Sequence, residues 1–263
     1  MIRVGVLGAT GRMGREVCQA LAEDPQLALA AAISPSRVGE SIGAIIGHPE
    51  EDIRISDLLD TALQADTDVL VDFTQPDAVM ENVRWAIEHA IHLVVGTSGI
   101  GPEELEEIAG LIEEDGSHVV VVSNFAIGAV LSQRFAEQAA RYFPAAEVVE
   151  LHHEGKADAP SGTALATARR IAAARGSEWS GPESESVPGV RGGDVEGVRV
   201  HSVRLPGLVA HQEVLFGGTG ETLTIRHDSL DRSSFMPGVL LAVKAVLSRP
   251  GLTVGLEPLL DLE

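Results

Sequence analysis

One short segment concentrates side chains that can carry protons. Residues 147–164 read EVVELHHEGKADAPSGTA, so an apolar run leads into His152 and His153, and Lys156 follows three residues later. Imidazole titrates near neutral pH, and a lysine ammonium group can shift its pKa and pass on a proton, which a guanidinium group does not do. This segment is therefore the first candidate for a site of proton transfer.

The lysine in this segment is unusual for the chain. Lys156 and Lys244 are the two lysines among 19 basic residues, so the chain generally uses arginine where it needs a cation. A lysine kept at position 156 suggests a task for a compact ammonium group whose pKa can shift.

The residues after the lysine predict a site for a carboxylate. Ser161, Gly162 and Thr163 follow Pro160 at an expected helix start, where free backbone amides and hydroxyl groups bind anions. The chain has 39 acidic and 19 basic residues and a formal charge of −20, so its overall field repels anions. An acidic substrate therefore requires a local basic pocket, and this segment supplies one.

Two other uses of these residue types are disfavoured. Adjacent residues of a strand point to opposite faces, and no nearby Cys or third His completes a tetrahedral set, so no metal site is predicted. The single cysteine, Cys18, lies in a helical pattern and is expected to be a buried structural thiol. Neither a catalytic cysteine nor an internal disulfide is expected.

A second candidate site lies near the amino terminus, where a G-x-x-G-x-x-G sequence follows the expected strand Ile2–Leu7. The loop consists of Gly8, Ala9, Thr10, Gly11, Arg12 and Met13, with Gly14 next. A tight turn between a strand and a helix presents backbone amides to a pyrophosphate. We expect a dinucleotide at this loop.

The residue type expected to select the cofactor is missing. Twenty residues beyond Gly14, where a carboxylate commonly binds the adenosine ribose of NAD, this chain has Ser34. Arg12 and Arg37, with the hydroxyls of Ser34 and Ser36, are suited to hold a 2′-phosphate. The sequence slightly favours NADPH, and use of both NADPH and NADH is expected.

Two further strand ends point to the same ligand. Residues 72–74 (Asp-Phe-Thr, with Phe73 at the centre) end one expected strand, and Gly96, Thr97, Ser98 and Gly99 end the next. Ligands of doubly wound sheets bind beyond the carboxyl ends of the strands. Together with the glycine loop, these residues outline a nicotinamide pocket.

The first half of the chain predicts the α/β fold that would position these loops. Short apolar runs alternate with helical periodicity, which is typical of a doubly wound, Rossmann-like parallel sheet. The expected strands are Ile2–Leu7, Leu27–Ile33, 68–73, 91–95 and 118–122, and the expected helices are 11–22, 77–89 and 102–114.

After Asn124 the pattern changes towards a smaller α+β domain with a mixed or antiparallel sheet. Its expected elements are a helix over 128–142, a strand over 148–151, a helix from Ser161, a surface loop over 177–197, and a hairpin of 208–216 and 222–227 around the glycine-rich residues 217–220. A final helix over 234–247 is expected to pack on the first domain. The predicted domains are 1–124 with 234–263 for the dinucleotide, and 125–233 for substrate and oligomerisation.

The bulk properties limit the partners. The negative charge disfavours nucleic acid and anionic lipid surfaces. No signal peptide precedes the first expected strand, and no apolar run approaches the roughly 20 residues that span a bilayer. We expect a soluble, cytoplasmic protein with a small dicarboxylate substrate.

Taken together, these segments resemble the dihydrodipicolinate reductases, also called 4-hydroxy-tetrahydrodipicolinate reductases, of diaminopimelate and lysine biosynthesis. Residues 147–164 fit the signature of that family. The glycine loop, the DFT and GTSG sequences and the SNF sequence at 123–125 stand in the family's order, so the resemblance covers essentially the whole chain.

The resemblance implies roles for individual residues. His152 would be the proton donor or acceptor and Lys156 a second proton donor, while His153, Gly162 and Thr163 would hold the substrate. The residues implied to contact the dinucleotide are 8–13, 96–98 and the segment Val122, Ser123, Asn124 and Phe125.

The resemblance also implies hydride transfer from NAD(P)H to the C4 region of the dehydrated ring, a homotetramer built through the sheet of the second domain, and closure of the domains over ligands. Two residues depart from the family pattern: Ser34 replaces the common acidic residue, and Ser98 stands where threonine is usual. The first departure bears on cofactor preference.

Two alternatives stay open from the residues. One is another two-domain NAD(P)-dependent imine or keto-acid reductase, and the other is a non-catalytic redox sensor that binds a dinucleotide. A sensor has no need of His152, His153 and Lys156 beside an anion-binding helix start. Substrate turnover separates the remaining two hypotheses.

Overall fold

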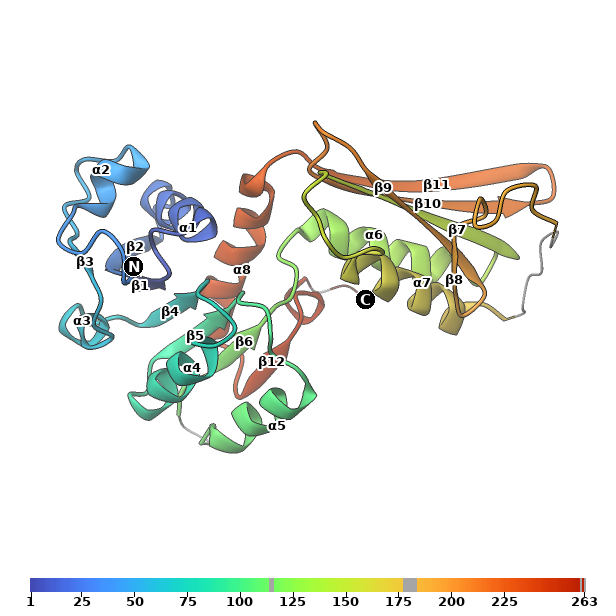
Figure 1. The fold of residues 1–263 in the computed structure, drawn as a ribbon. Coiled ribbons are helices and arrows are strands. Elements are labelled where there is room, and N and C mark those ends of the chain that lie inside the picture. The colour runs from blue at the N-terminus through green and yellow to red at the C-terminus, as the bar shows by residue number, and fades with distance from the viewer. Residues whose placement is uncertain (114–115, 177–183, 261, 263) are drawn as a thin grey trace. The chain divides into compact units, whose positions relative to one another are not determined.

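The computed structural model describes residues 1–113, 116–176, 184–260 and 262. The chain forms two compact units (Figure 1). Unit 1 comprises Met1–Ala126 and Phe235–Glu263, and unit 2 comprises Ile127–Ser234. The chain thus passes between units after residues 126 and 234, where the sequence predicted 124 and 233.

Unit 1 contains a seven-stranded parallel sheet in the order β12-β6-β5-β4-β1-β2-β3. The strands are β1 (Ile2–Leu7), β2 (Leu27–Ile33), β3 (Ile55–Ser56), β4 (Val69–Asp72), β5 (His92–Val95), β6 (Val119–Val121) and β12 (Leu252–Val254). The order reverses around β1, as in a doubly wound fold, so the expectation of a parallel α/β domain is confirmed.

Helices cover both faces of this sheet. They are α1 (Arg12–Glu23), α2 (Ile42–Ile46), α3 (Asp60–Gln64), α4 (Val79–Glu88), α5 (Pro102–Leu111) and α8 (Met236–Val246), with the 3-10 turn η2 (Glu257–Leu259). Helix α8 packs against α1, β5 and β6, and α4 packs against α5, β4 and β5 (Figure 1). The expected return of the last helix to the first unit is confirmed.

The burial pattern explains these elements. All four residues of β4 are buried, as expected for a strand covered on both faces. Helix α1 buries a stripe that includes Val17, Cys18 and Leu21. Cys18 is fully enclosed, and burial raises the pKa of its thiol, so it is the inert structural cysteine that was predicted.

Five short elements of unit 1 were not predicted, namely α2, β3, α3, β12 and η2. Each has five residues or fewer, which is too short for a periodic pattern to stand out. Helix α2 is instead set by its ends: the hydroxyl of Ser41 accepts a hydrogen bond from the backbone of Ala44, and Gly47 closes the helix at φ +83°.

Unit 2 contains a five-stranded mixed sheet in the order β11-β10-β7-β9-β8, in which the β7–β9 pair is parallel and the others are antiparallel. The strands are β7 (Ala145–His152), β8 (Gly193–Val195), β9 (Val198–Arg204), β10 (Ala210–Gly218) and β11 (Glu221–Ser229). The predicted hairpin is β10–β11, with Gly217 and Gly218 inside β10 instead of in the turn.

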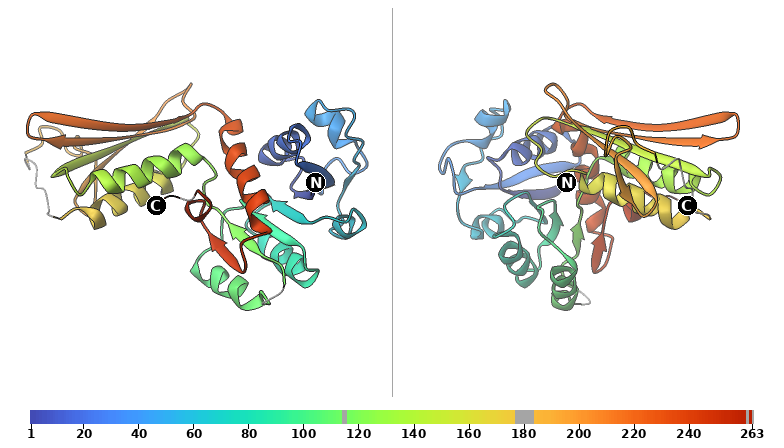
Figure 2. Two further views of the ribbon diagram at one scale, coloured as in Figure 1. Left: turned by 180° about the vertical axis from the view of Figure 1, so that it is seen from behind. Right: turned by 45° about the vertical axis from the view of Figure 1, so that its right-hand side comes forward.

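Helices α6 (Ile127–Ala139) and α7 (Gly162–Ala174) lie together on one face of the second sheet (Figure 2). Val148, Val200, Val214 and Phe216 point into the core below them. The 3-10 turn η1 (Arg232–Phe235) leads out of the unit. The prediction of a mixed sheet is confirmed.

The expected surface loop over 177–197 was partly wrong, because residues 193–195 form β8. Three residues are too short for a visible alternation, and β8 gains its order from pairing with β9. Residues 177–183 of that expected loop lie outside the described residues. Across the part of the chain that the structure describes, no helix is long and apolar enough to cross a membrane.

Candidate active site

The glycine loop makes a tight turn at the end of β1. The backbone amides of Gly8 and Ala9 both donate to the carbonyl of Ile33, at 2.9 and 3.1 Å. Gly8 has φ +78°, and a Cβ atom there would lie 2.5 Å from the carbonyl oxygen of Phe73. Glycine is required at this position both for its conformation and for the close approach of β4.

The first helix packs directly on this loop. A Cβ atom at Gly14 would lie 2.1 Å from the carbonyl oxygen of Gly8, so helix α1 approaches the turn as closely as a backbone can. Gly11 is the N-cap of α1, and no side chain caps the helix there. The first amides of α1 thus have no side-chain acceptor at the N-cap, which is the form of a helix start that can bind a pyrophosphate.

Three hydroxyl groups gather beside the loop. Thr10 Oγ1 lies 2.6 Å from Ser34 Oγ and 2.7 Å from Ser36 Oγ. The guanidinium of Arg37, predicted to share a phosphate with these serines, instead pairs with Glu40 at 2.7 Å. The structure therefore brings Ser34 and Ser36 together, whereas Arg37 is engaged elsewhere and the Arg12 side chain is exposed.

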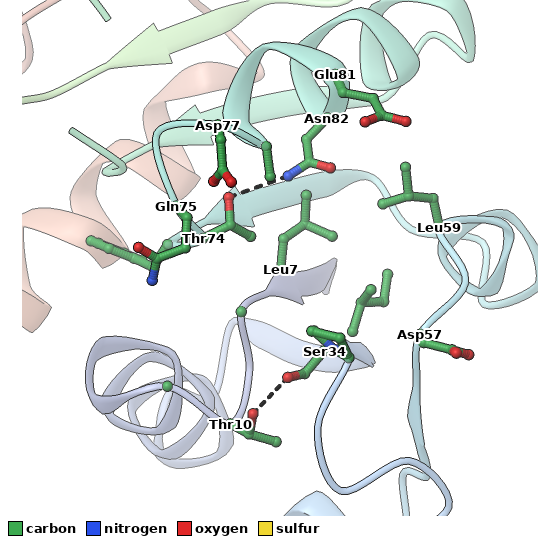
Figure 3. A pocket seen from close by; sticks show the side chains of 16 residues that line it. Leu7, Thr10, Ser34, Asp57, Leu59, Thr74, Gln75, Asp77, Glu81 and Asn82 are labelled. Carbon is green, nitrogen blue, oxygen red and sulfur yellow. Dashed lines mark hydrogen bonds between the residues drawn. The ribbon is translucent and has the colours of Figure 1, made fainter. Parts of the chain in front are cut away.

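A cavity of about 460 Å³ opens beside these hydroxyls (Figure 3). It is lined by residues from β1, from the ends of β2 and β4, from the loop before α3 and from α4, and these include Leu7, Gly8, Thr10, Ser34, Phe73 and Asn82. The acidic residues Asp57, Asp77 and Glu81 also line it. Within the described residues, its lining contains no Lys or Arg.

The buried carboxylate of Asp72 ties the neighbouring loops together. It accepts hydrogen bonds from Thr74 Oγ1 at 2.7 Å, Asn82 Nδ2 at 2.7 Å and Thr97 Oγ1 at 2.6 Å. Thr97 belongs to the GTSG segment that follows β5. The two strand ends predicted to contribute to one pocket are thus joined by direct hydrogen bonds.

The aromatic residues of this region meet around a glycine. The rings of Phe73 and Phe125 have centroids 5.6 Å apart. A Cβ atom at Gly96 would lie 2.3 Å from the Phe73 ring and 2.8 Å from the Phe125 ring, so any side chain there would have to displace the rings.

The remaining predicted cofactor residues surround this cluster. Val122 continues β6 by donating to the carbonyl of Val95 at 2.9 Å, and the Asn124 side chain accepts from the backbone of Ala126 at 2.9 Å. Ser98 and Ser123 are exposed beyond the strand ends.

In unit 2, His152 is the last residue of β7 and is largely buried. Its Nδ1 atom forms a short hydrogen bond with Glu150 Oε2. Burial lowers the pKa of His152, and the nearby charges of Lys156 and Arg204 add to that effect, while Glu150 opposes it. His153 is the next residue and is exposed.

Lys156 lies in the loop after β7, where its Nζ atom is 2.6 Å from Asp158 Oδ1. The ammonium group lowers the pKa of Asp158 through this hydrogen bond. The side chain of Lys156 is 22% exposed, so it lies near the surface but retains little contact with water. This position suits a group that approaches a ligand.

The predicted helix start after Pro160 is the start of α7. Ser161 is the N-cap, and its hydroxyl oxygen accepts from the backbone of Ala164 at 3.2 Å. A Cβ atom at Gly162 would meet nothing within 4 Å, so the first turn is open. The carbonyl of Thr163 accepts from Gln133 on α6 at 3.2 Å, which fixes this helix end to its neighbour.

The sequence of each unit matches one family. Residues 2–125 match the model described as dihydrodipicolinate reductase, N-terminus, and residues 128–260 match the corresponding C-terminus model. The chain belongs to the dihydrodipicolinate reductase family.

Individual relatives agree with this membership. A 4-hydroxy-tetrahydrodipicolinate reductase of Nocardia farcinica is 54% identical and covers 99% of both chains. One from Mycobacterium sp. (strain KMS) is 53% identical over 99% of this chain and all of the relative.

Solved structures agree as well. A dipicolinate-bound dihydrodipicolinate reductase from Paenisporosarcina sp. TG-14 is 38% identical, with a TM-score of 0.87 and coverage of 98% of this chain and 99% of that one. An amine dehydrogenase from Mycobacterium smegmatis, at 15% identity, a TM-score of 0.69 and coverage of 97% of this chain and 95% of that one, shares the fold alone.

Sequence reasoning missed two residues of the candidate site of this reductase-family chain, Glu150 and Arg204. Glu150 is fully buried beside His152, and Arg204 is the residue of β9 that pairs in register with His152. The alternation Val148, Glu150, His152 on one strand face was a usable signal for the first. Arg204 lies 52 positions beyond His152, and its proximity depends on the parallel pairing of β7 and β9.

The arrangement does not favour a metal. Glu150 is already occupied by hydrogen-bond donors, and no group of three or more His, Cys, Asp or Glu side chains suited to a metal ion occurs within residues 1–113, 116–176 and 184–260. The chemistry available in unit 2 is proton transfer and carboxylate binding.

Proposed function

We propose that this chain reduces 4-hydroxy-tetrahydrodipicolinate to tetrahydrodipicolinate with NADH or NADPH. One hydride and one proton are added to the substrate, and one water leaves. The observation that carries the proposal is the largely buried His152, next to Lys156 and the open start of α7, in a chain that matches the reductase family from end to end. These groups supply the proton and the positive field that this reaction needs.

Unit 1 is proposed to hold the dinucleotide. When bound, the nicotinamide supplies the hydride. The loop over residues 8–13 would hold the pyrophosphate against the first amides of α1, because Gly8 and Gly14 let the loop, Phe73 and the helix start pack backbone to backbone in this tight turn. Gly96, Thr97 and Ser98, with residues 122–125 and Phe73, would surround the nicotinamide end.

The substrate is proposed to bind unit 2 through its carboxylates. The hydroxyl of Ser161 and the first amides of α7 at Gly162 and Thr163 would bind one carboxylate, with His153 beside it. The relative of known structure was solved with dipicolinate, a ring that carries two carboxylates. The proposed substrate has the same pair of charges.

His152 and Lys156 are proposed to handle protons. The Nδ1 atom of His152 is engaged by Glu150, so its Nε2 atom is the one that exchanges a proton with the substrate. The ammonium group of Lys156 is proposed to balance the negative charge of the substrate and to act as a second proton donor beside His152.

Both nicotinamide cofactors are proposed to be used. The neutral hydroxyls of Thr10, Ser34 and Ser36 neither repel a 2′-phosphate, as a carboxylate would, nor supply its fixed positive charge. Arg37 would have to leave Glu40 to contact that phosphate, and because this pair is exposed the exchange costs little.

We also propose that the protein is a homotetramer that associates through the second sheet. Helices α6 and α7 pack on one face of this sheet (Figure 2). On the other face Leu215 is 38% exposed, beside a hollow of about 220 Å³ lined partly by Glu147 and Thr222. Light scattering coupled to size exclusion measures the mass, and a monomeric mass would contradict the proposal.

The function is tested by absorbance at 340 nm. The purified protein is mixed with the condensation product of pyruvate and aspartate semialdehyde, with NADH and NADPH in separate reactions. Loss of absorbance that depends on the ring supports the proposal. No loss with this ring, together with turnover of another imine or keto acid, would identify a different reductase.

A further inference from the structure

The carboxylate of Glu150 is the most completely enclosed charge in unit 2 among the described residues, with no exposed surface. Its Oε1 atom accepts from Arg204 Nη2 at 2.8 Å and from the backbone amide of Ser161 at 3.3 Å. Its Oε2 atom accepts from Arg204 Nη1 at 2.9 Å and from His152 Nδ1. Each oxygen therefore has at least two donors, and these come from three separate segments of the chain.

We propose that Glu150 is the positioning residue of the reductase site: it holds His152 with the proton on Nδ1, and through Arg204 and Ser161 it joins the imidazole to the carboxylate-binding start of α7. The inference rests on the proposed function, in which His152 handles a proton. Glu150 itself is too deeply enclosed to contact substrate, so its effect is exerted through its neighbours.

The tautomer follows from the charge of Glu150. An ionised carboxylate only accepts hydrogen bonds, so the bond to His152 requires a proton on Nδ1. The Nε2 atom is then the ring nitrogen that gains and loses a proton during turnover. Carboxylates that orient an imidazole in this way commonly fix both its rotation and its basicity.

The surroundings keep Glu150 ionised. Burial alone would raise its pKa, but hydrogen bonds from Arg204, Ser202 and His152 lower it below the ordinary value. The two parallel bonds from the Arg204 guanidinium are of the strong, charge-assisted type. Arg204 thus serves as the counter-ion of the carboxylate that orients His152.

Arg204 also fixes the loop that carries Lys156. Its Nε atom donates to the carbonyl of Lys156 at 3.3 Å, and its Nη2 atom donates to the carbonyl of Asp158 at 2.6 Å. The backbone on both sides of residue 157 is therefore held by the same guanidinium that neutralises Glu150. One buried ion pair positions the histidine, the lysine loop and the first residue of the anion site.

Three charged groups face the His152 ring: Glu150 from its own strand, Lys156 from the loop and Arg204 from β9. Burial and the two cations lower the pKa of His152, and Glu150 is the group that raises it. Removal of the Glu150 charge should therefore lower the pKa of His152 further. In a reaction that needs a protonated His152, activity would then be lost at a lower pH.

The same strand contains a matched control. Glu147 also bonds to an arginine and a histidine, since it accepts from Arg191 and lies 2.8 Å from His201 Nε2. Its position in β7 is three residues from Glu150, on the opposite face of the sheet, and its side chain is 27% exposed. Glu147→Gln removes an equivalent charge without touching the proposed site.

The first test compares Glu150→Gln with Glu147→Gln in steady-state kinetics over a pH range. Because the glutamine amide donates to Nδ1, it favours the wrong tautomer, and we expect kcat to fall about 10³-fold, with a much smaller rise in KM for the ring from the Ser161 end of the same side chain. The basic limb of the kcat profile should move to lower pH. Glu147→Gln should keep kcat within about twofold and the limb in place, with its oligomeric mass checked.

The second test observes the tautomer without turnover. In ¹⁵N spectra of the histidine rings, with the His152 signals assigned from their loss in His152→Gln, the wild-type protein at pH 7.5 should carry the proton on Nδ1. Glu150→Gln should carry it on Nε2. A wild-type proton on Nε2, or wild-type kcat and an unmoved pH limb in Glu150→Gln, would overturn the inference.

A third variant keeps the test decisive if Glu150→Gln does not fold. Glu150→Asp retains the charge but draws it back by one methylene, so it should recover more than a tenth of wild-type kcat with the pH limb at its wild-type position. A limb displaced to lower pH in this variant would argue against the carboxylate as the cause. If the wild-type protein does not reduce the ring at all, the proposed function fails, while the wild-type ring spectrum still decides the tautomer.

Discussion

The candidate cofactor half-site of unit 1 and the candidate substrate half-site of unit 2 depend on different kinds of groups. In unit 1, the cradle at Gly8 and Gly14 consists of backbone atoms and hydroxyl groups, and its form depends on where a Cβ atom is absent. In unit 2, the site depends on a buried carboxylate, Glu150, that holds a histidine and an arginine. The first half-site depends on backbone shape and the second on charge. An added methyl group should therefore impair the first, and a removed charge should impair the second.

The largest effect is expected at the charged half-site. Lys156→Ala should lower kcat about 10³-fold or more, because it removes a proposed proton donor and the ammonium group that balances the substrate. The affinity for NADH, measured by fluorescence titration, should stay within about twofold, since Lys156 belongs to unit 2. Equal loss of kcat and of dinucleotide affinity would point to a folding defect.

The control for this variant is Lys244→Ala. Lys244 forms a lysine–aspartate pair of the same length, 2.6 Å to Asp24 Oδ2, in unit 1. Like Lys156→Ala, the Lys244→Ala substitution removes a lysine and leaves its aspartate without that partner. Because Lys244 has no proposed role in proton transfer, kcat should stay near the wild-type value. A comparable fall in kcat would show that loss of any such pair impairs the enzyme.

The shape-dependent half-site should respond to one methyl group. In Gly14→Ala the new Cβ would meet the Gly8 carbonyl oxygen at 2.1 Å, and backbone must move because both partners are rigid. A displacement of about 1 Å in a binding loop costs on the order of 10²-fold, which we expect in the Kd for NADH. The ring affinity of unit 2, measured by calorimetry with dipicolinate, should be unchanged.

Gly110→Ala is the matched control for the methyl group. Gly110 lies in α5, is exposed, and a Cβ atom there would meet nothing within 4 Å. The same substitution should stabilise the protein by ~0.5–1 kcal/mol, because alanine favours a helix. A similarly weakened affinity for NADH in this variant would show that the loss in Gly14→Ala does not come from the geometry of the glycine loop.

A smaller effect is expected when a charge is introduced into the half-site of unit 1. Ser34→Asp places a carboxylate beside Thr10, and this charge should repel a 2′-phosphate while accepting from a ribose hydroxyl. The ratio of kcat/KM for NADH over NADPH should rise about tenfold, or ~1.4 kcal/mol. An unchanged ratio would remove Ser34 from the adenosine pocket.

Ser41→Asp supplies the control for the added charge. Ser41 caps α2 in the same unit, and aspartate is an equally good cap that loses only the long 3.4 Å bond from the serine hydroxyl to the Glu51 carbonyl, so the fold should be kept. The cofactor ratio should then stay at the wild-type value. A shift equal to that of Ser34→Asp would indicate a general effect of net charge.

The difference between the half-sites also explains what the sequence could predict. The glycine loop is local, since Gly8, Gly11 and Gly14 stand within seven residues between a strand and a helix, and β1 and β2 match their expected bounds. The segment from His152 to Thr163 is local too. In each case the ligand-binding residues and their spacing lie in one stretch of chain.

The parts that could not be predicted depend on partners far away in the sequence. Arg204 reaches Glu150 across 54 positions, and the pairing of β7 with β9 brings them together. The Arg37–Glu40 pair is a local example, since Arg37 was assigned to a phosphate from its position near Ser34 and Ser36 but forms an ion pair with Glu40. Charge networks therefore need the fold, whereas backbone cradles can be recognised from spacing.

The smallest effect is expected at a half-buried pair of histidines, His92 and His118, in unit 1. His92 Nδ1 accepts from the backbone amide of His118 at 2.9 Å, and the two rings lie 4.6 Å apart. Burial first, and the neighbouring His118 second, lower the pKa of His92. A protonated His92 would lose its acceptor and repel the second ring.

The sign of the pH effect follows from this lowered pKa. The unfolded chain binds a proton on His92 more readily than the folded one, so the stability from this contact is complete above about pH 6.5 and falls as the pH is lowered below that value. In His92→Asn the side-chain oxygen can take the place of Nδ1 without titrating. Between pH 7.5 and 5.5, the wild-type free energy of unfolding should fall by ~1 kcal/mol more than that of the variant, the value of one hydrogen bond. Urea unfolding at both pH values measures this difference, and equal losses in the two proteins would show that other groups, such as His152 and His227, carry the whole pH dependence.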